Sequence, residues 1–214
     1  LFTSNSGADK RKIFYELAVT FEADKNNNPY EMLFFGTGDR EHPVRTDTND
    51  TTNPIQTDRM YAVKDKAQTY TITESYLTDV TTDELQALPG TSQSQIDCVL
   101  SRLGWQKVIT GCDEQDGWYI KLDAFGANSE EKVLASATVF NQGAYYTTFA
   151  PDTSGSTNVC ISGNLGTARV YGVHWRTGEA IINFDTTNDS TSTTNARAKD
   201  TSGRILLRSD RAET

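Results

Sequence analysis

Short apolar stretches alternate with polar clusters along the whole chain of 214 residues. Apolar or alternating runs of this length are typical of strands with one or both faces buried. The polar clusters are rich in Asn, Asp, Thr, Ser and Gly, which favour turns and loops. The pattern therefore predicts an all-β fold. Strands are expected at residues 14–21, 31–35, 59–63, 67–72, 117–122, 132–140, 144–149, 169–174 and 180–184.

Two local patterns refine this picture. Residues 168–181, ARVYGVHWRTGEAI, predict a strand, a tight turn at 176–179 and a returning strand. The segment TTDELQALPG is the one helix candidate, because Thr82 is a good cap and Pro89-Gly90 would end the helix.

Two parts of the chain resemble each other. Residues 16–65 and 136–175 each contain an apolar strand, a second strand, a polar segment and then an Arg-x-Tyr-x-Val strand. A repeat of this kind is expected when similar sheets bury their faces against one another, as the blades of a β-propeller do. An antiparallel sandwich would contain similar strands and is the alternative.

Composition limits the classes of function. The hydrophobic fraction of 36% can build a core, and the net charge of −9 argues against a nucleic-acid partner. No apolar run approaches the roughly 20 residues that a membrane-spanning helix needs. Residues 186–203 are polar and of low complexity, which predicts a flexible loop, and residues 204–214, RILLRSDRAET, are expected to be the start of a further strand that is cut short.

The chain has three cysteines, Cys98, Cys112 and Cys160. A disulfide between Cys98 and Cys112 would close a short loop and stabilise the fold by roughly 3 kcal/mol. The acidic, Asn- and Thr-rich composition is typical of an extracellular protein and favours this bridge. Three reduced, buried thiols are the alternative. If the bridge forms, Cys160 needs a partner elsewhere.

Residues that could carry chemistry are few. His42 and His174 lie far apart in the sequence, and no His/Cys spacing predicts a zinc site. No nucleophile elbow, phosphate-binding loop or dinucleotide fingerprint occurs. Trp118 and the pair Tyr145-Tyr146 are expected to pack between sheets rather than to bind a ligand. The sequence thus predicts no hydrolase or nucleotide site.

Calcium is considered at two loops. Asp24, Asn26, Asn28 and Glu31 form one candidate set, and the second consists of Asp185, Asn188 and Asp189. Calcium requires six to eight oxygen ligands, and neither loop has the glycine that an EF-hand loop places at its sixth position. Ordinary Asn/Asp turns with side-chain to backbone hydrogen bonds are the alternative.

Five ordered motifs resemble the C-terminal domain of the PilY family, the assembly factors and tip adhesins of type IV pili. They are LFFGTGDRE (33–41), DRMYAVKD (58–65), GWYIKLD (117–123), EKVLASATVFNQGAYYTTFAP (131–151), and Cys160 followed by GTARVYGVHWRTGEAIINFD (166–185). Together they extend over nearly the whole chain.

The resemblance implies part of a modified, quinoprotein-like β-propeller with long polar loops, formed by residues 1–214 as a fragment of a longer protein. It also implies an extracellular location at the pilus tip, minor pilins as partners, and host or surface ligands. The calcium loop of the family is expected upstream of Leu1, so no calcium ligand is transferred to this chain. An Arg-Gly-Asp motif is absent from the sequence.

Three functions are compatible with such a domain. The first is a non-enzymatic pilus protein that supports pilus assembly, adhesion and twitching motility. The second is a quinone-dependent periplasmic dehydrogenase, which would need a carboxylate base and repeated Trp/Gly docking motifs that this sequence lacks. The third is a purely structural component of an extracellular filament.

Overall fold

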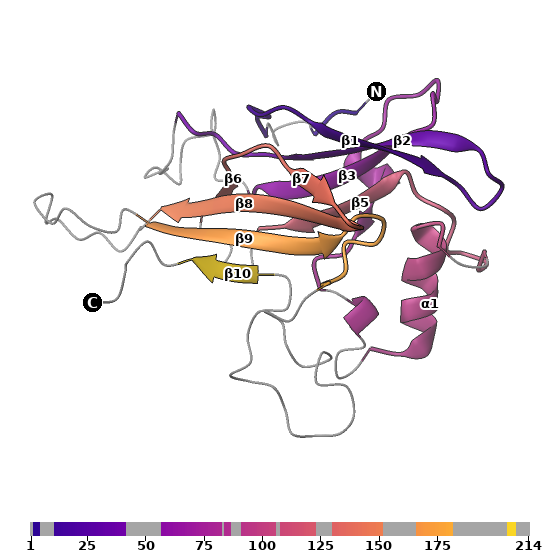
Figure 1. Ribbon diagram of the computed structural model, residues 1–214. Coiled ribbons are helices and arrows are strands. Elements are labelled where there is room, and N and C mark those ends of the chain that lie inside the picture. The colour runs from indigo at the N-terminus through magenta and orange to yellow at the C-terminus, as the bar shows by residue number, and fades with distance from the viewer. Residues whose placement is uncertain are drawn as a thin grey trace, which may run out of the picture.

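A computed structural model describes residues 2–4, 11–41, 57–82, 84–86, 91–105, 108–122, 130–151, 166–181 and 205–208. Within these ranges the chain forms two five-stranded β-sheets and one α-helix (Figure 1). The all-β class expected from the sequence is confirmed. No helix in the described ranges has the length and hydropathy that a membrane crossing demands.

The first sheet has the strand order β1-β2-β3-β5-β4. All its pairs are antiparallel except the short β4, which runs parallel to β5. Its strands are β1 (Ala18–Ala23), β2 (Pro29–Gly36), β3 (Arg59–Asp65), β4 (Thr78–Asp79) and β5 (Gly117–Lys121).

The second sheet has the order β10-β9-β8-β6, and β7 also pairs with β8. Every pair in it is antiparallel. Its strands are β6 (Lys132–Val133), β7 (Thr138–Phe140), β8 (Gly143–Pro151), β9 (Gly166–His174) and β10 (Ile205–Arg208).

The repeat expected from the sequence corresponds to the topology. In the first copy, β1, β2 and β3 form a continuous antiparallel meander, and β7, β8 and β9 do the same in the second copy. A fourth strand, β5 or β10, then extends each meander on the side of the Arg-x-Tyr-x-Val strand. The expected strand after residue 204 is β10.

Three strand predictions differ from the structure. The strand expected at 14–21 begins only at Ala18 and extends to Ala23. Residues 67–72 were expected to form a strand, but the chain turns after β3 because the N–H of Ala67 bonds Asp65 Oδ1 and Ala67 adopts a φ of 56°. Only Ile72 joins a ladder, as a single bridge to Phe2. The expected strand at 132–140 is divided into β6 and β7, because the chain bends at Ala135.

The predicted hairpin after β9 is confirmed. The N–H of His174 donates to Glu179 O at 2.8 Å, and Gly178 has a φ of 69° that suits glycine. Ala180 then bridges to Val173, which starts the returning strand. The remainder of that prediction, residues 182–184, lies outside the described ranges.

The helix prediction was wrong in its position. Near Thr82 the described residues form only the 3₁₀ turn η2 (Glu84–Gln86), and a second 3₁₀ turn, η1 (Glu74–Tyr76), precedes β4. The α-helix is α1 (Gln93–Arg102). It begins with a capping box, in which Ser92 Oγ accepts from Gln95 N–H while Gln95 Oε1 accepts from Ser92 N–H.

The main core lies between the two sheets. Its central side chains from the first sheet are Met32, Phe34, Met60 and Trp118, all fully buried. Tyr146, Tyr171 and Val173 belong to the same core cluster and come from the second sheet. A smaller cluster, with Phe35, Tyr61 and Val63, covers the opposite face of the first sheet.

Two cross-sheet hydrogen bonds fix how the sheets meet. Tyr146 OH donates to the carbonyl of Tyr61 at 2.8 Å, and Trp118 Nε1 donates to the carbonyl of Trp175 at 2.9 Å. Both aromatic side chains are fully buried, so their polar atoms need partners inside the protein. The expectation that these side chains pack between the sheets is confirmed for Trp118 and Tyr146, whereas Tyr145, on the other face of β8, is only partly buried and lies outside the core cluster.

The two sheets are stacked in the same sense. Tyr171 of the second Arg-x-Tyr-x-Val strand faces the core between the sheets, whereas Tyr61 of the first lies in the cluster on the far side of its sheet. Equivalent faces therefore point in one direction. In a two-layer sandwich built from a repeat, equivalent faces would instead point at each other. The described sheets form an open stack of two and do not close into a ring.

The sheets approach closely at Gly36. A Cβ atom at this position would lie 2.2 Å from Val133 Cγ2. We expect Gly36→Ala to lower the free energy of unfolding by about 1–3 kcal/mol because the inserted methyl overpacks the core. Chemical denaturation measures the loss.

The control is the same change in a Val133→Ala background, where the clash is removed. The cost of Gly36→Ala should then be smaller than in the wild-type background. An equal cost in both backgrounds would contradict the described packing.

Candidate functional site

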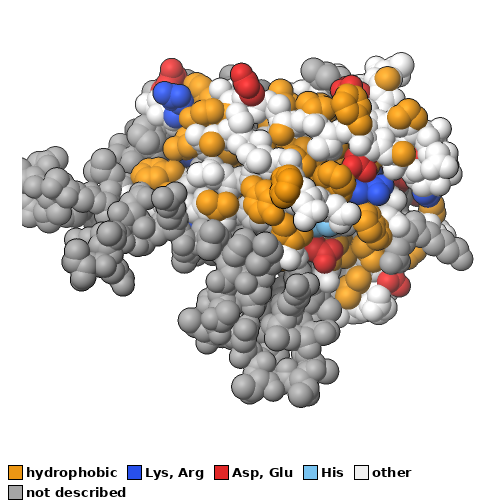
Figure 2. All heavy atoms as spheres, in the orientation of Figure 1, with side chains coloured by type: hydrophobic (Ala, Val, Ile, Leu, Met, Phe, Trp, Pro, Cys, Tyr) orange, Lys and Arg blue, Asp and Glu red, His pale blue; other side chains and the backbone are white. Residues whose placement is uncertain are grey.

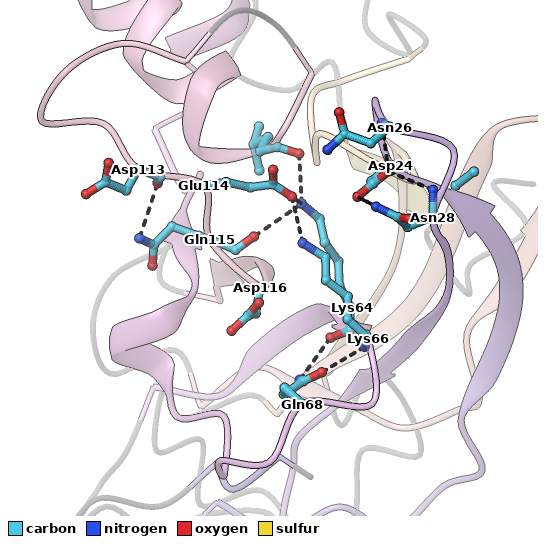
Figure 3. Close-up of polar contacts among 12 residues, drawn as sticks. Asp24, Asn26, Asn28, Lys64, Lys66, Gln68, Asp113, Glu114, Gln115 and Asp116 are labelled. Carbon is cyan, nitrogen blue, oxygen red and sulfur yellow. Dashed lines mark hydrogen bonds and ion pairs between the residues drawn. The ribbon is translucent and has the colours of Figure 1, made fainter.

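The first calcium candidate is the turn between β1 and β2. Asp24 Oδ1 accepts from the backbone N–H groups of Asn26, at 2.8 Å, and Asn28, at 2.9 Å (Figure 3). Asp24 Oδ2 accepts from Asn28 Nδ2 at 3.0 Å. These hydrogen bonds hold the pKa of Asp24 below its usual value.

This geometry does not fit a calcium ion. Both oxygens of the single carboxylate already accept hydrogen bonds from the turn, and Glu31 lies further along, in β2. The arrangement is the Asn/Asp turn that the sequence offered as the alternative. Among the residues that the structure describes, no three His, Cys, Asp or Glu side chains form a group able to hold a metal.

Several sequence-predicted residues lie outside the described ranges. They are His42, Cys160, Asp185, Asn188, Asp189 and the predicted loop 186–203.

A buried lysine that the sequence did not single out joins β3 to the segment after α1. Lys64 Nζ donates to the carbonyls of Leu103, at 3.0 Å, and Gln115, at 3.2 Å. It also lies 3.2 Å from Glu114 Oε1, and Lys66 Nζ lies 2.7 Å from the same oxygen. Figure 3 shows the two lysine side chains converging on Glu114.

The protein environment shifts the pKa values of this cluster. Burial lowers the pKa of Lys64 to about 8, although the nearby carboxylate of Glu114 acts in the opposite direction. The pKa of Glu114 is lowered: burial acts to raise it, and the combined effect of Lys66 and Lys64 outweighs burial. The cluster is therefore a part-buried ionic contact in which two ammonium groups share one carboxylate, so the charge of Lys64 is not isolated.

A disulfide closes the loop that ends two residues before Glu114. Cys98 in α1 and Cys112 are bonded, with their Cα atoms 5.3 Å apart. Ser101 Oγ supports the same loop, since it donates to the carbonyl of Cys112 and accepts from the N–H of Ile109. The predicted disulfide is confirmed, and the alternative of three reduced thiols is wrong for these two residues.

The Arg and Tyr side chains of each Arg-x-Tyr-x-Val strand bind the carboxylate of a glutamate from another segment. On β3, Arg59 Nη1 and Tyr61 OH both contact Glu74 Oε1, and Arg11 Nη2 joins them. This cluster anchors η1 to the far face of the first sheet.

The second copy contains the same three residue types. On β9, Arg169 Nη1 lies 3.1 Å from Glu131 Oε2, and Tyr171 OH donates to Glu131 Oε1 at 3.1 Å. Thr148 Oγ1 donates to the same carboxylate, which is buried between the sheets. The repeated Arg and Tyr could be recognised in the sequence. Their glutamate partners could not, because Glu74 follows its strand in the chain whereas Glu131 precedes its strand.

His174 is a packing residue. Its ring meets the ring of Trp105 edge-on, with centroids 5.4 Å apart, and burial lowers its pKa. Arg176 lies 5.0 Å above the same indole and donates to the carbonyl of Ala23 at 3.1 Å. This group joins the disulfide loop, the turn after β9 and the β1–β2 hairpin.

Comparison with solved structures identifies the fold. The structure is similar to the crystal structure of the Pseudomonas aeruginosa PilY1 C-terminal domain, with a TM-score of 0.53 and 16% sequence identity. The similarity covers 97% of this chain and 41% of that chain. The chain has a PilY1-like fold. The resemblance to the PilY family is thus confirmed at the level of the fold, and the chain spans about two-fifths of the length of the PilY1 domain structure.

Sequence comparisons give no match. No model of a protein family matches the chain, and no curated protein is similar to it in sequence.

The depressed pKa of Lys64 predicts a pH dependence of stability. Between about pH 8 and the ordinary lysine pKa of 10.5, the unfolded chain binds a proton that folded Lys64 has released. Stability should therefore rise with pH across this window, by about 1.4 kcal/mol for each unit of the pKa difference. The measurement is the free energy of unfolding at several pH values in wild type and Lys64→Met.

The difference between the two proteins isolates this lysine from other titrating groups. Lys64→Met should lack the rise, whereas Lys25→Met, at an exposed turn position, should keep it. Identical pH profiles for wild type and Lys64→Met would contradict the buried, paired state of Lys64.

The disulfide gives a second prediction. Cys98 and Cys112 should resist alkylation in the native protein and react after reduction, as mass spectrometry would detect. Reduction should lower the free energy of unfolding by roughly 3 kcal/mol because the unfolded chain regains loop entropy. Cys98→Ala/Cys112→Ala should match the reduced protein and become insensitive to reductant. Labelling of both thiols without reductant would disprove the bridge.

Proposed function

We propose that this chain is the blade-forming part of a PilY-type protein of type IV pili, located outside the cell at the pilus tip. The observation that carries the proposal is the shared fold with the PilY1 C-terminal domain over 97% of the chain, reached independently of the sequence motifs. The confirmed disulfide supports export, because such bridges persist in oxidising compartments.

The two sheets are, in this proposal, adjacent blades of a modified β-propeller. Four antiparallel strands in meander order form the blade of a propeller, and both sheets contain such a meander. The equivalent faces of the two sheets point in one direction, so the front of one sheet packs on the back of the other. This supports the assignment, because such a contact repeated with a constant rotation generates a ring.

The proposed role is structural and adhesive rather than enzymatic. The protein would act with minor pilins in pilus assembly and twitching motility, and its loops would contact host or abiotic surfaces. Calcium, if bound, would be held by residues other than Asp24 and Asn28, whose side chains bond each other within a turn. A filament component without adhesive activity would share this fold.

Immunogold labelling of intact cells tests the location. An antibody against this chain should label filament tips in a piliated strain, and the label should disappear in a strain that lacks the major pilin. A strain with the gene for this chain deleted controls for antibody specificity.

Label that is unchanged without pili, or that appears only after the outer membrane is opened, would contradict the proposal. Dye-linked oxidation of alcohols or sugars after addition of a quinone would then support the dehydrogenase alternative.

A further inference from the structure

β1 is an edge strand whose outer side is open. Within the described residues it pairs with β2 alone. At the end of the ladder, Asp24 N–H donates to Asn28 O. In an antiparallel pair, successive residues of a strand direct their backbone N–H and C=O groups alternately toward and away from the partner strand. The backbone groups of Val19, Phe21 and Ala23 therefore point away from β2. Ala23 O accepts from Arg176 Nη2, which agrees with this direction.

The side chains of this strand are equally unusual. On the face away from the second sheet, Val19 is 47% and Phe21 is 82% exposed, and Leu17 just before the strand is 49% exposed. Figure 2 shows hydrophobic side chains at the surface above the β1–β2 hairpin. Natural edge strands are normally protected by charges, prolines or bulges, and the outward face of β1 has none of these protections.

Two carboxylates lie beside these exposed apolar side chains. Phe21 is directly opposite Glu31 on β2, and Glu31 is directly opposite Asp65 on β3, so all three share one face. They line a shallow pocket of about 380 Å³. Like charges directly opposite each other destabilise a sheet, and the side-chain carboxylate of Glu31 makes no hydrogen bond or ion pair within the described chain. Lys66 also lines the pocket, but its ammonium group is paired with Glu114.

We propose that the β1 edge binds an extended, basic peptide segment of a partner protein by strand addition. The peptide would supply the hydrogen-bond partners of Val19 and Phe21, about 4.8 Å from β1. An Arg or Lys opposite Phe21 would lie across that ring and reach Glu31, combining a cation–π contact with an ion pair. Asp65 would add to the negative potential that attracts this side chain.

Charge selects this occupant over a second copy of the chain. A second copy would bring its own Glu31 and Asp65 and a net charge of −9 to the same edge. A basic segment instead removes the repulsion between the two carboxylates. The proposal concerns the described edge strand itself and does not depend on the pilus assignment.

Selection from a displayed library of random peptides of about ten residues, the length of a long strand, tests the proposal. The selected peptides should alternate β-branched or aromatic residues with polar ones and contain Arg or Lys. Binding of the best peptide should slow hydrogen exchange at the outward N–H groups of Val19 and Phe21, measured by NMR.

Three variants sharpen the test. Val19→Pro removes one outward donor without removing a ladder bond to β2, and should weaken binding at least tenfold. Glu31→Gln/Asp65→Asn keeps the backbone and should weaken the same peptide about tenfold, while a Gln-substituted peptide should bind wild type and this variant equally. Val108→Thr, at an exposed apolar position in the disulfide loop, is the matched control and should stay within twofold.

The proposal is overturned if the library yields no binder above background, or if the selected peptides lack basic residues. Binding that is unaffected by both β1-edge variants, or exchange protection that lies outside β1, would overturn it as well. Should Val19→Pro fail to fold, the carboxylate variant and the exchange measurement still decide the outcome.

Discussion

The contact between the two sheets is the constraint on which the remaining structure depends. Tyr146 and Trp118 are fully buried there; Tyr146 donates to the Tyr61 carbonyl in β3, and Trp118 donates to the Trp175 carbonyl in the turn that follows β9. An aromatic ring in this position contributes a large apolar area, but its polar atom must be satisfied, so only one alignment of the sheets suits both residues. Gly36 permits the close approach that this alignment requires.

The sequence predicted the strands well where apolar periodicity and the repeat agreed, as in β2, β3, β8 and β9. The strand predicted at residues 67–72 did not form, because a local turn begins there: Ala67 adopts a positive φ and its N–H bonds the Asp65 side chain. The helix was placed too early because Pro89-Gly90 was taken as its end. The signal for the true helix was present in the Ser92-x-x-Gln95 capping box, with Ile96, Val99 and Leu103 on one face.

The site residues show a different limit. Cys98 and Cys112 could be paired from the sequence because they are few and close in the chain. Lys64 could not be recognised, since its partners lie 39 to 51 residues away and only the fold brings them together. Which face of one sheet packs on which face of the other could not be predicted either. The alternation of side chains along a strand shows that it has two faces, but not which sheet each face will contact.

The disulfide also determines how the chain would respond to mechanical force. Tension that passes along the backbone crosses from Cys98 to Cys112 through the sulfur atoms, so the residues between them are not stretched. A separation of 14 residues corresponds to about 45 Å of extended chain. The last residues of α1, from Cys98 to Arg102, and the Leu103 carbonyl that accepts from Lys64 lie inside this covalent loop, so none of that length can be extended. The domain under tension would thus lengthen less than its sequence allows.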